Sequence, residues 1–192
     1  VLFTLVCLGV LKTNNKKLVK GDIKSDIEEI EYLSNVADSL KRCKTTADIN
    51  EIKEELIKEG YIKKSVKRKA AEPKIGFRPE EFVSEDGFKI LVGRNNVEND
   101  RLTMKFASKS DLWFHVKNAA GAHVILITEG RQVSDSALLF AASLAAKNSS
   151  LSASQNVPVD YTFVKSVKKP NGAKAGMVIY ETNKTLYVDP AK

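Results

Sequence analysis

The hydrophobic period of this chain changes once, and that change constrains its architecture more than any other feature. Between Asp22 and Arg42, apolar residues recur at steps of three or four, which is the period of a helix with one apolar face. After Pro79, apolar and polar residues alternate, which is the period of strands. The 192 residues have room for one globular domain and an extension. The pattern therefore predicts an α+β fold, a mainly antiparallel sheet with one or two packed helices, preceded by a helical hairpin.

The helical part divides into two helices joined by a few residues. The first carries an apolar stripe from Ile23 to Leu40. The second begins at 45–48, where a threonine offers a capping hydroxyl and an aspartate follows in the first turn, and Gly60 is placed to stop it. We predict that 22–62 forms this hairpin as a coiled-coil arm.

Two segments outside the hairpin carry weaker signals. Residues 1–21 begin with an apolar run shorter than the roughly 20 residues of a membrane span, and their role is unexplained. Residues 63–79 contain KKSVKRK, with five basic residues in seven, and are predicted to be a basic linker. The remaining residues, 80–192, are predicted to form the sheet domain.

Within the sheet domain, one alanine-rich helix interrupts the strands. That helix is expected at 137–147, with Ser134 or Asp135 as its cap. Alternating or continuous apolar runs predict the strands, which are 88–92, 101–106, 112–117, 124–127, 160–167, 177–181 and 185–188.

The charge balance favours an acidic partner. The net charge is +7 and the isoelectric point is near 9.3, which suits RNA, DNA or an anionic surface without distinguishing among them. The two cysteines, Cys7 and Cys43, lie far apart and neither belongs to a CxxC motif. A disulfide framework or zinc site is therefore not expected, and a reducing, cytoplasmic setting fits best.

The stretch from 93 to 124 concentrates polar and aromatic chemistry. It contains both histidines and the only tryptophan. An arginine beside amides can bind a phosphate while the amides contact base edges or sugar hydroxyls. The same amides can instead bond their own backbone in turns, and both interpretations stay open. The candidate RNA contacts in the first part of this stretch are Arg94, Asn95, Asn96, Asn99 and Asp100.

Pairing of the strand at 112–117 with its successor across a four-residue turn would separate the two histidines. On that register, His115 shares a face with Trp113 and Lys117, where it could stack on a base and pair with phosphate. His123 would lie on the opposite face, as a hydrogen-bonded core histidine or a further RNA contact. Opposite faces argue against joint metal binding, and no third ligand has suitable spacing.

A second candidate surface is the loop around Pro170. Lysines and flexible glycines in a connection between strands suit phosphate contact, although a solvated hairpin tip explains them equally well. No nucleophile motif, P-loop or Rossmann fingerprint is present, so no catalytic residue is predicted. Acid–base work by His115 with Asp111 is a minor alternative. The candidate lysines are Lys165, Lys168, Lys169 and Lys174.

Three strings carry a family resemblance: GRNNVENDRLTMKFASKSDLWFHVKNAAGAHVIL, NVPVDYTFVKSVKKPNGAKAGMVIY and KTLYVDP. They resemble the C-terminal NFACT-R domain of the NFACT family, which includes bacterial RqcH and proteins called fibronectin-binding protein A. The strings DIEEIEYLSNV and DINEIKEELIKEGYIKK resemble the end of that family's coiled-coil middle region. The likeness covers Asp22 to Asp189.

The resemblance implies a role in ribosome-associated quality control. The family binds large ribosomal subunits that still hold peptidyl-tRNA, and it recruits tRNA so that a C-terminal tail is added to the nascent chain. Because the ribosome forms the peptide bond, the resemblance implies a cytoplasmic RNA-binding factor that is not an enzyme, needs no cofactor and does not engage a membrane. The alternative partner is fibronectin, with the chain as part of a surface adhesin.

Overall fold

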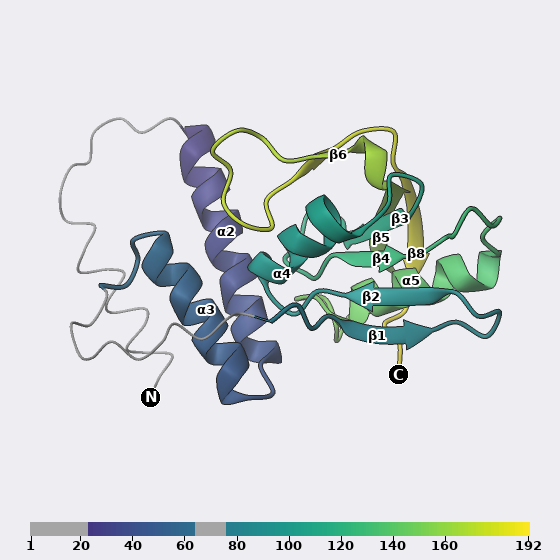
Figure 1. Cartoon of the computed structure of the whole chain (residues 1–192), viewed down its shortest axis with the longest axis horizontal. Coiled ribbons are helices and arrows are strands. Elements are labelled where there is room, and N and C mark those ends of the chain that lie inside the picture. The colour runs from purple at the N-terminus through teal and green to yellow at the C-terminus, as the bar shows by residue number, and fades with distance from the viewer. Residues whose placement is uncertain (1–22, 64–75) are drawn as a thin grey trace.

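The fold was analysed in a computed structural model, which describes residues 23–63 and 76–192. Figure 1 shows two helices at one end of the molecule, beside a sheet domain that contains the C-terminus. The predictions for 1–21 and for most of the basic linker lie outside the described residues. The α+β class, with a helical hairpin before an antiparallel sheet, is confirmed.

The hairpin consists of α2 (Ile23–Arg42) and α3 (Thr46–Lys58). Thr45 caps α3 through a capping box with Asp48, because each side chain accepts a hydrogen bond from the other residue's backbone. Gly60, with φ of +83°, follows the end of α3. These local signals were all present in the sequence, which explains why the hairpin could be predicted.

The apolar stripe predicted for α2 is only partly buried. Ile27 and Ile30 are 51% and 66% exposed, whereas Tyr32, which lies off the stripe, is fully buried. The Tyr32 hydroxyl donates to Glu55 of α3 at 2.8 Å, so its ring can enter the core without leaving its polar end unpaired. The hairpin core is formed by Tyr32, Val36, Ile52 and Leu56.

The sheet has six antiparallel strands in the order β1-β2-β4-β3-β5-β8. A separate pair, β6 with β7, lies in the segment that crosses back toward α2 (Figure 1). The bounds are β1 Glu80–Val83, β2 Lys89–Val92, β3 Leu112–Val116, β4 Val124–Leu126, β5 Val157–Phe163, β6 Val167–Lys168, β7 Ile179–Tyr180 and β8 Lys184–Val188.

One face of the sheet is covered by α5 (Asp135–Lys147). Ser134 caps this helix by accepting a hydrogen bond from the Ala137 backbone at 3.1 Å. Ala137, Ala141 and Ala145 are fully buried, and their spacing of four places them on one side of the helix. The helix and its cap match the prediction, and the small side chains let the helix lie close to the strands.

The opposite face is also covered, so both sides of the central strands are buried. Leu91, Trp113 and Ile125 pack there with Leu102 of η1, a π-helical segment (Leu102–Phe106), and with Val164 of η2, a short 3-10 helix (Val164–Ser166). Trp113 is fully buried as a result. This second face carries the candidate site.

The strand predicted at 101–106 is wrong, because α4 (Asn96–Arg101) and η1 occupy this region. Asn95 caps α4 by accepting a hydrogen bond from the Glu98 backbone at 2.9 Å, and Glu98 accepts one from the Arg94 backbone at 3.0 Å. These hydrogen bonds pair the backbone amides of Glu98 and Arg94, which in a strand would have bonded to a neighbouring strand. The alternation at 102, 104 and 106 was therefore misleading.

Candidate nucleic-acid interface

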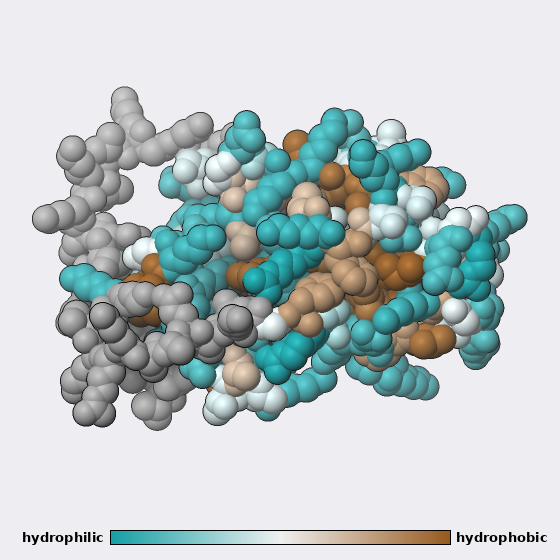
Figure 2. All heavy atoms as spheres, in the orientation of Figure 1, coloured by the Kyte–Doolittle hydropathy of each residue, from teal (hydrophilic) through white to brown (hydrophobic). Residues whose placement is uncertain are grey.

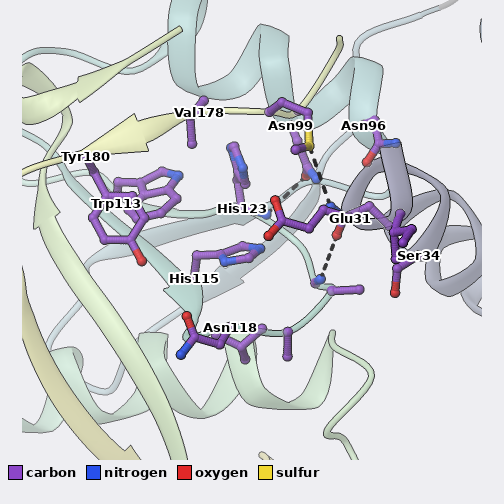
Figure 3. A pocket seen from close by; sticks show the side chains of 18 residues that line it. Glu31, Ser34, Asn96, Asn99, Trp113, His115, Asn118, His123, Val178 and Tyr180 are labelled. Carbon is purple, nitrogen blue, oxygen red and sulfur yellow. Dashed lines mark hydrogen bonds between the residues drawn. The ribbon is translucent and has the colours of Figure 1, made fainter. Parts of the chain in front are cut away.

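A cavity of about 360 Å³ lies between α2 and the sheet face that carries Trp113. Its walls come from α2, α4, β3, the turn at 118–121 and the segment at 176–180. Figure 3 shows the side chains that line it and their origin on separate elements. We call it the ring-lined cavity, because its lining includes Trp113, His115, His123 and Tyr180.

The two histidines lie on the same face, so their predicted separation is wrong. In the β3–β4 ladder Phe114 pairs with Val124, and continuing this register sets His115 opposite His123. Their ring centroids are 5.5 Å apart, with the planes at 87°. The expected register differs from this one by a single residue, and such a shift moves every side chain to the other face.

The residues before β4 explain the difference in register. Gly121 forms a bridge with Ser149, and the Ala122 amide donates to the Asn148 carbonyl at 2.9 Å, so this segment is held by the end of α5. The His123 amide then donates to Asn99 Oδ1 at 3.1 Å. These partners are distant in sequence, and no local turn rule predicts them.

Trp113 lies in the wall of the cavity, although it was predicted at the outer surface. Its ring stacks with His115 at a centroid distance of 5.7 Å and an interplanar angle of 12°. It also lies 4.8 Å from the Tyr180 ring and 5.3 Å from the His123 ring. The indole Nε1 is buried and makes no hydrogen bond within the described part of the chain.

Both imidazoles favour the neutral form. Burial lowers the pKa of His115, and burial together with repulsion from His115 lowers the pKa of His123 well below its usual value of 6.5. A neutral imidazole offers one donor and one acceptor nitrogen. Thr103 Oγ1 lies 2.8 Å from His123 Nδ1 and holds that ring in place. Among the residues that the structure describes, no group of three or more His, Cys, Asp or Glu side chains could hold a metal ion.

A buried carboxylate positions one side of the cavity. Asp160 accepts hydrogen bonds from Tyr180 at 2.9 Å and from Thr185 at 2.5 Å. Burial and the Asp160 carboxylate raise the pKa of the Tyr180 hydroxyl, which therefore stays protonated. Lys117 lies 3.5 Å from the same carboxylate and its side chain is 43% exposed, so this candidate contact remains accessible.

Arg94, predicted to bind phosphate, is surrounded by acidic side chains. Its guanidinium pairs with Asp48, with Glu51 at 3.5 Å and with Glu98 at 3.0 Å. Only 19% of its side chain is exposed. Three carboxylates neutralise the charge and would repel a phosphate, so we leave Arg94 out of the proposed RNA surface.

The neighbouring amides also bind within the chain. Asn95 donates to Glu51 at 2.9 Å and Asn96 donates to Glu55 at 3.1 Å, which ties α4 to α3. Both asparagines are 2% exposed. We therefore assign them to the contact between the hairpin and the sheet domain, which we call the hairpin clamp together with Arg94.

The last two candidates before η1 are also engaged. Asn99 supports the His123 backbone, as described above, and it is 2% exposed. Asp100 accepts a hydrogen bond from Lys169 at 2.6 Å. A Cβ added at Gly93 would lie 2.1 Å from Asn99 Oδ1, so only glycine allows this close approach.

The lysine loop divides into two pairs. Lys169 and Lys174 are 29% and 27% exposed, and they tie the loop to Asp100 and to Glu29 respectively. Lys174 also lies over the Tyr32 ring, 4.5 Å from its centroid. We call these two the anchored lysines.

The other two lysines project into solvent. Lys168 is 61% exposed and its distant pairing with exposed Glu181, at 3.8 Å, contributes little. Lys165 is exposed and lies 5.1 Å from the centroid of the Phe163 ring, which is itself 46% exposed. We call Lys165 and Lys168 the exposed lysines, and they are the members of the loop that are accessible to RNA.

Several residues at the cavity were not predicted. Tyr180 lies in a predicted strand and could have been noticed as an aromatic residue beside the lysine loop. Asn35 of α2 donates to Met177 Sδ at 3.9 Å and accepts from the Gly121 amide at 3.2 Å, while Glu31 lines the same cavity. Polar positions on an amphipathic helix resemble a solvated face, so no local signal identifies these two.

The outer surface is mixed in character. In Figure 2 hydrophilic residues dominate the viewed face, and apolar atoms gather near its centre around β2. Phe77 and Phe106 are 37% and 52% exposed, with ring centroids 5.1 Å apart. No helix within 23–63 and 76–192 has the length and apolar character needed to cross a membrane.

Two family models match the chain. The NFACT protein RNA binding domain matches residues 78–181, and the NFACT N-terminal and middle domains match residues 11–74. The first match covers β1 to β7, and with them the four ring-bearing residues of the cavity, but not its wall on α2. The second covers the hairpin.

Relatives and a solved structure agree with these matches. The Rqc2 homolog RqcH of Bacillus subtilis (strain 168) is 37% identical over 182 residues, which are 92% of this chain and 31% of that protein. The protein of the same name in Streptococcus suis (strain 05ZYH33) is 42% identical over 85% of this chain and 29% of its own length. The structure of the C-terminal of the fibronectin/fibrinogen-binding protein from Streptococcus suis is similar with a TM-score of 0.79 at 40% identity, covering 88% of this chain and 67% of that one. The chain thus spans less than a third of each of these two RqcH relatives, and it belongs to the NFACT family, with the family's RNA binding domain at 78–181.

Proposed function

We propose that this chain is the RNA-binding, C-terminal part of a ribosome-associated quality-control factor. The observation that carries the proposal is the match of residues 78–181 to the NFACT protein RNA binding domain. Similarity to proteins named Rqc2 homolog RqcH supports it, as does the net charge of +7.

The finer proposal concerns the partners. The factor binds large ribosomal subunits that hold a stalled peptidyl-tRNA, together with a tRNA, and supports C-terminal tailing of the nascent chain. Because the relatives are about three times as long as the aligned part, this chain contributes only part of the contacts.

We also propose that the chain has no catalytic step of its own. Asp111 directly precedes β3 and lies four residues from His115, a separation of about 13 Å along an extended chain. Its carboxylate accepts hydrogen bonds from the Ser108 and Thr128 backbones at 2.8 and 2.9 Å, which explains its burial. Acid–base work by this pair therefore has no geometric support, and the proposed role requires no cofactor.

The RNA surface that we propose combines Lys117 at the cavity with the exposed lysines of the loop. Lys117 lies on the sheet face opposite α5. The exposed lysines lie on the segment that covers this face. Lysines contact phosphates as mobile point charges, so exposed side chains are more useful there than anchored ones.

Binding of labelled tRNA, followed by fluorescence anisotropy across a salt series, tests this surface. Replacing both exposed lysines (Lys165→Glu and Lys168→Glu) is expected to weaken binding and to reduce the salt slope by about 0.7 to 0.9 per lost phosphate contact. Lys147→Glu is the control for each single replacement, because it makes the same charge change and Lys147 lies on α5 across the sheet. Equal loss in the control would indicate a non-specific charge effect, and unchanged binding in the double variant would remove the loop from the surface.

A second candidate function is protein binding to fibronectin. It is favoured by one observation, the similarity to a protein described as fibronectin/fibrinogen-binding. Binding of this chain to immobilised fibronectin, together with its detection on unpermeabilised cells, would support it. Binding that disappears at moderate salt would instead indicate charge attraction by a basic protein.

A further inference from the structure

The ring-lined cavity has the size of a small-ligand site and an unusual lining. Its volume of about 360 Å³ falls within the range of about 300 to 1,000 Å³ that is common for such pockets. Trp113 and His115 lie on β3, His123 directly precedes β4, and Tyr180 closes one side from β7. Strands hold side chains more rigidly than loops do, so these rings form a preorganised surface.

Trp113 provides a hydrogen-bond donor without a partner. Its side chain is fully buried, yet Nε1 makes no hydrogen bond within the described residues. Figure 3 shows the indole beside Tyr180, with its nitrogen turned toward Val178 and His123. Buried polar groups are almost always paired, so an exception in a cavity wall points to a ligand that carries an acceptor.

The other polar groups of the lining are largely uncharged. Both imidazoles favour their neutral forms, and Asn99 and Asn118 contribute amide side chains to the lining. Glu31 of α2 points into the cavity toward His115 (Figure 3). A carboxylate beside neutral rings disfavours a phosphate or carboxylate ligand, and it can accept a hydrogen bond from an amino group.

Lys117 provides a positive charge next to the cavity. It directly follows β3, two residues past His115, and its pairing with Asp160, the β5 partner of His115, places it on the same face at a distance of about 7 Å along the chain. Its side chain is 43% exposed. The cavity thus suits a flat, uncharged ring with hydrogen-bonding edges. Lys117 beside it suits a phosphate on the same strand of nucleic acid.

We propose that the ring-lined cavity receives one unstacked nucleobase of a single-stranded RNA segment, with Trp113 and His115 as its principal contacts and Lys117 at the adjoining phosphate. This proposal rests on the RNA-binding function proposed above. It goes further by assigning a base-recognition site that is separate from the phosphate contacts of the lysine loop.

The single tryptophan makes the test direct, because Trp113 is the only source of tryptophan emission in the chain. The probes are short oligo(A), oligo(C) and oligo(U) RNAs, each with a counterpart of equal length that carries abasic residues. Binding of each labelled RNA is measured by anisotropy, and tryptophan emission is recorded in parallel. We expect at least one base-bearing RNA to change the emission and to bind about tenfold more tightly than its abasic counterpart, while the abasic RNAs leave the emission unchanged.

Two variants at the cavity separate stacking from hydrogen bonding. His115→Ala is expected to lose most of the advantage of the base-bearing RNA over its abasic counterpart, without changing abasic binding. His115→Phe keeps a ring and is expected to retain part of that advantage. Near-ultraviolet circular dichroism establishes that each variant keeps the native packing around Trp113.

The outcomes distinguish the two proposals. If base-bearing and abasic RNAs bind equally and leave the emission unchanged, the cavity proposal is overturned and the RNA-binding function stands. If none of the RNAs binds at low salt, both proposals fail.

Discussion

His115 of β3 and His123, which directly precedes β4, face each other with ring centroids 5.5 Å apart and planes nearly perpendicular. This contact places both histidines of the chain in one cavity wall with Trp113. It also links their protonation, because a charge on His115 opposes a second charge on His123. The protonation of this pair therefore affects both the stability of the sheet and the charge of the candidate site.

The first prediction concerns the dependence of stability on pH. Burial holds the pKa of His123 well below the usual value of 6.5, so the unfolded chain binds this proton more readily than the folded chain does. The stabilisation is fully present above pH 6.5 and is lost as the pH falls from 6.5 toward the folded-state pKa. The free energy of unfolding should decline there by up to about 1.4 kcal/mol per pH unit for each fully neutral buried histidine.

Urea denaturation of the chain and of His123→Gln, across pH values on both sides of 6.5, measures this effect. The variant should show a shallower decline, because glutamine does not titrate. Buried Glu55 has a raised pKa, mainly because of burial, and contributes the opposite slope, which the difference between the two proteins cancels. Parallel curves for the two proteins would contradict the prediction.

The second prediction concerns the hairpin clamp. Arg94→Ala leaves Asp48, Glu51 and Glu98 without the cation that they share, and breaking a largely buried ion pair costs about 3 kcal/mol. Lys89→Ala is the control, because Lys89 pairs with Glu81 at the surface and its loss should cost less than about 1 kcal/mol. Denaturant midpoints measure both changes, and equal effects would show that the clamp is not a stabilising contact.

The third prediction separates the anchored from the exposed lysines. Lys174→Glu places a carboxylate beside Glu29 and removes a cation from the ring of Tyr32, so it should destabilise the chain by about 1 to 3 kcal/mol. Lys168→Glu makes the same charge change at a solvated position and should alter stability by less than about 0.5 kcal/mol. Thermal unfolding compares the two, and equal shifts would mean that the loop is not anchored through Lys174.

The fourth prediction concerns the close packing behind the cavity. Gly93→Ala would bring a Cβ to 2.1 Å from Asn99 Oδ1, which accepts the His123 backbone hydrogen bond. The resulting shift should cost about 1 to 3 kcal/mol and change the tryptophan emission. Gly76→Ala is the matched control, because its nearest neighbours are side-chain atoms of Arg78 at 3.6 Å or more. Normal stability of Gly93→Ala would show that Asn99 can move freely.

The sequence could predict those parts of the fold that depend on neighbouring residues. Thr45 caps α3 and Ser134 caps α5 because a cap needs only a suitable side chain before an apolar helical pattern. The register of β3 and β4 could not be predicted, since it depends on contacts of Gly121 with Ser149 and of His123 with Asn99.

The candidate site shows the same division. The stretch at 93–124, which the sequence singles out by its polar and aromatic residues, supplies Trp113 and both histidines to one cavity. The partners of Arg94 and Asn95 were not predictable, because Glu51 lies more than 40 residues away on a separate helix. A polar residue beside a turn looks the same in sequence whether it faces RNA or a buried carboxylate.

The most direct test of the proposed function is co-sedimentation of this chain with large ribosomal subunits, with and without peptidyl-tRNA, across a salt series. The account predicts salt-sensitive binding that favours subunits carrying peptidyl-tRNA and that weakens when Lys165 and Lys168 are replaced by glutamate. Absence of binding at low salt would contradict it. So would an affinity that changes neither with the presence of peptidyl-tRNA nor with replacement of the lysines.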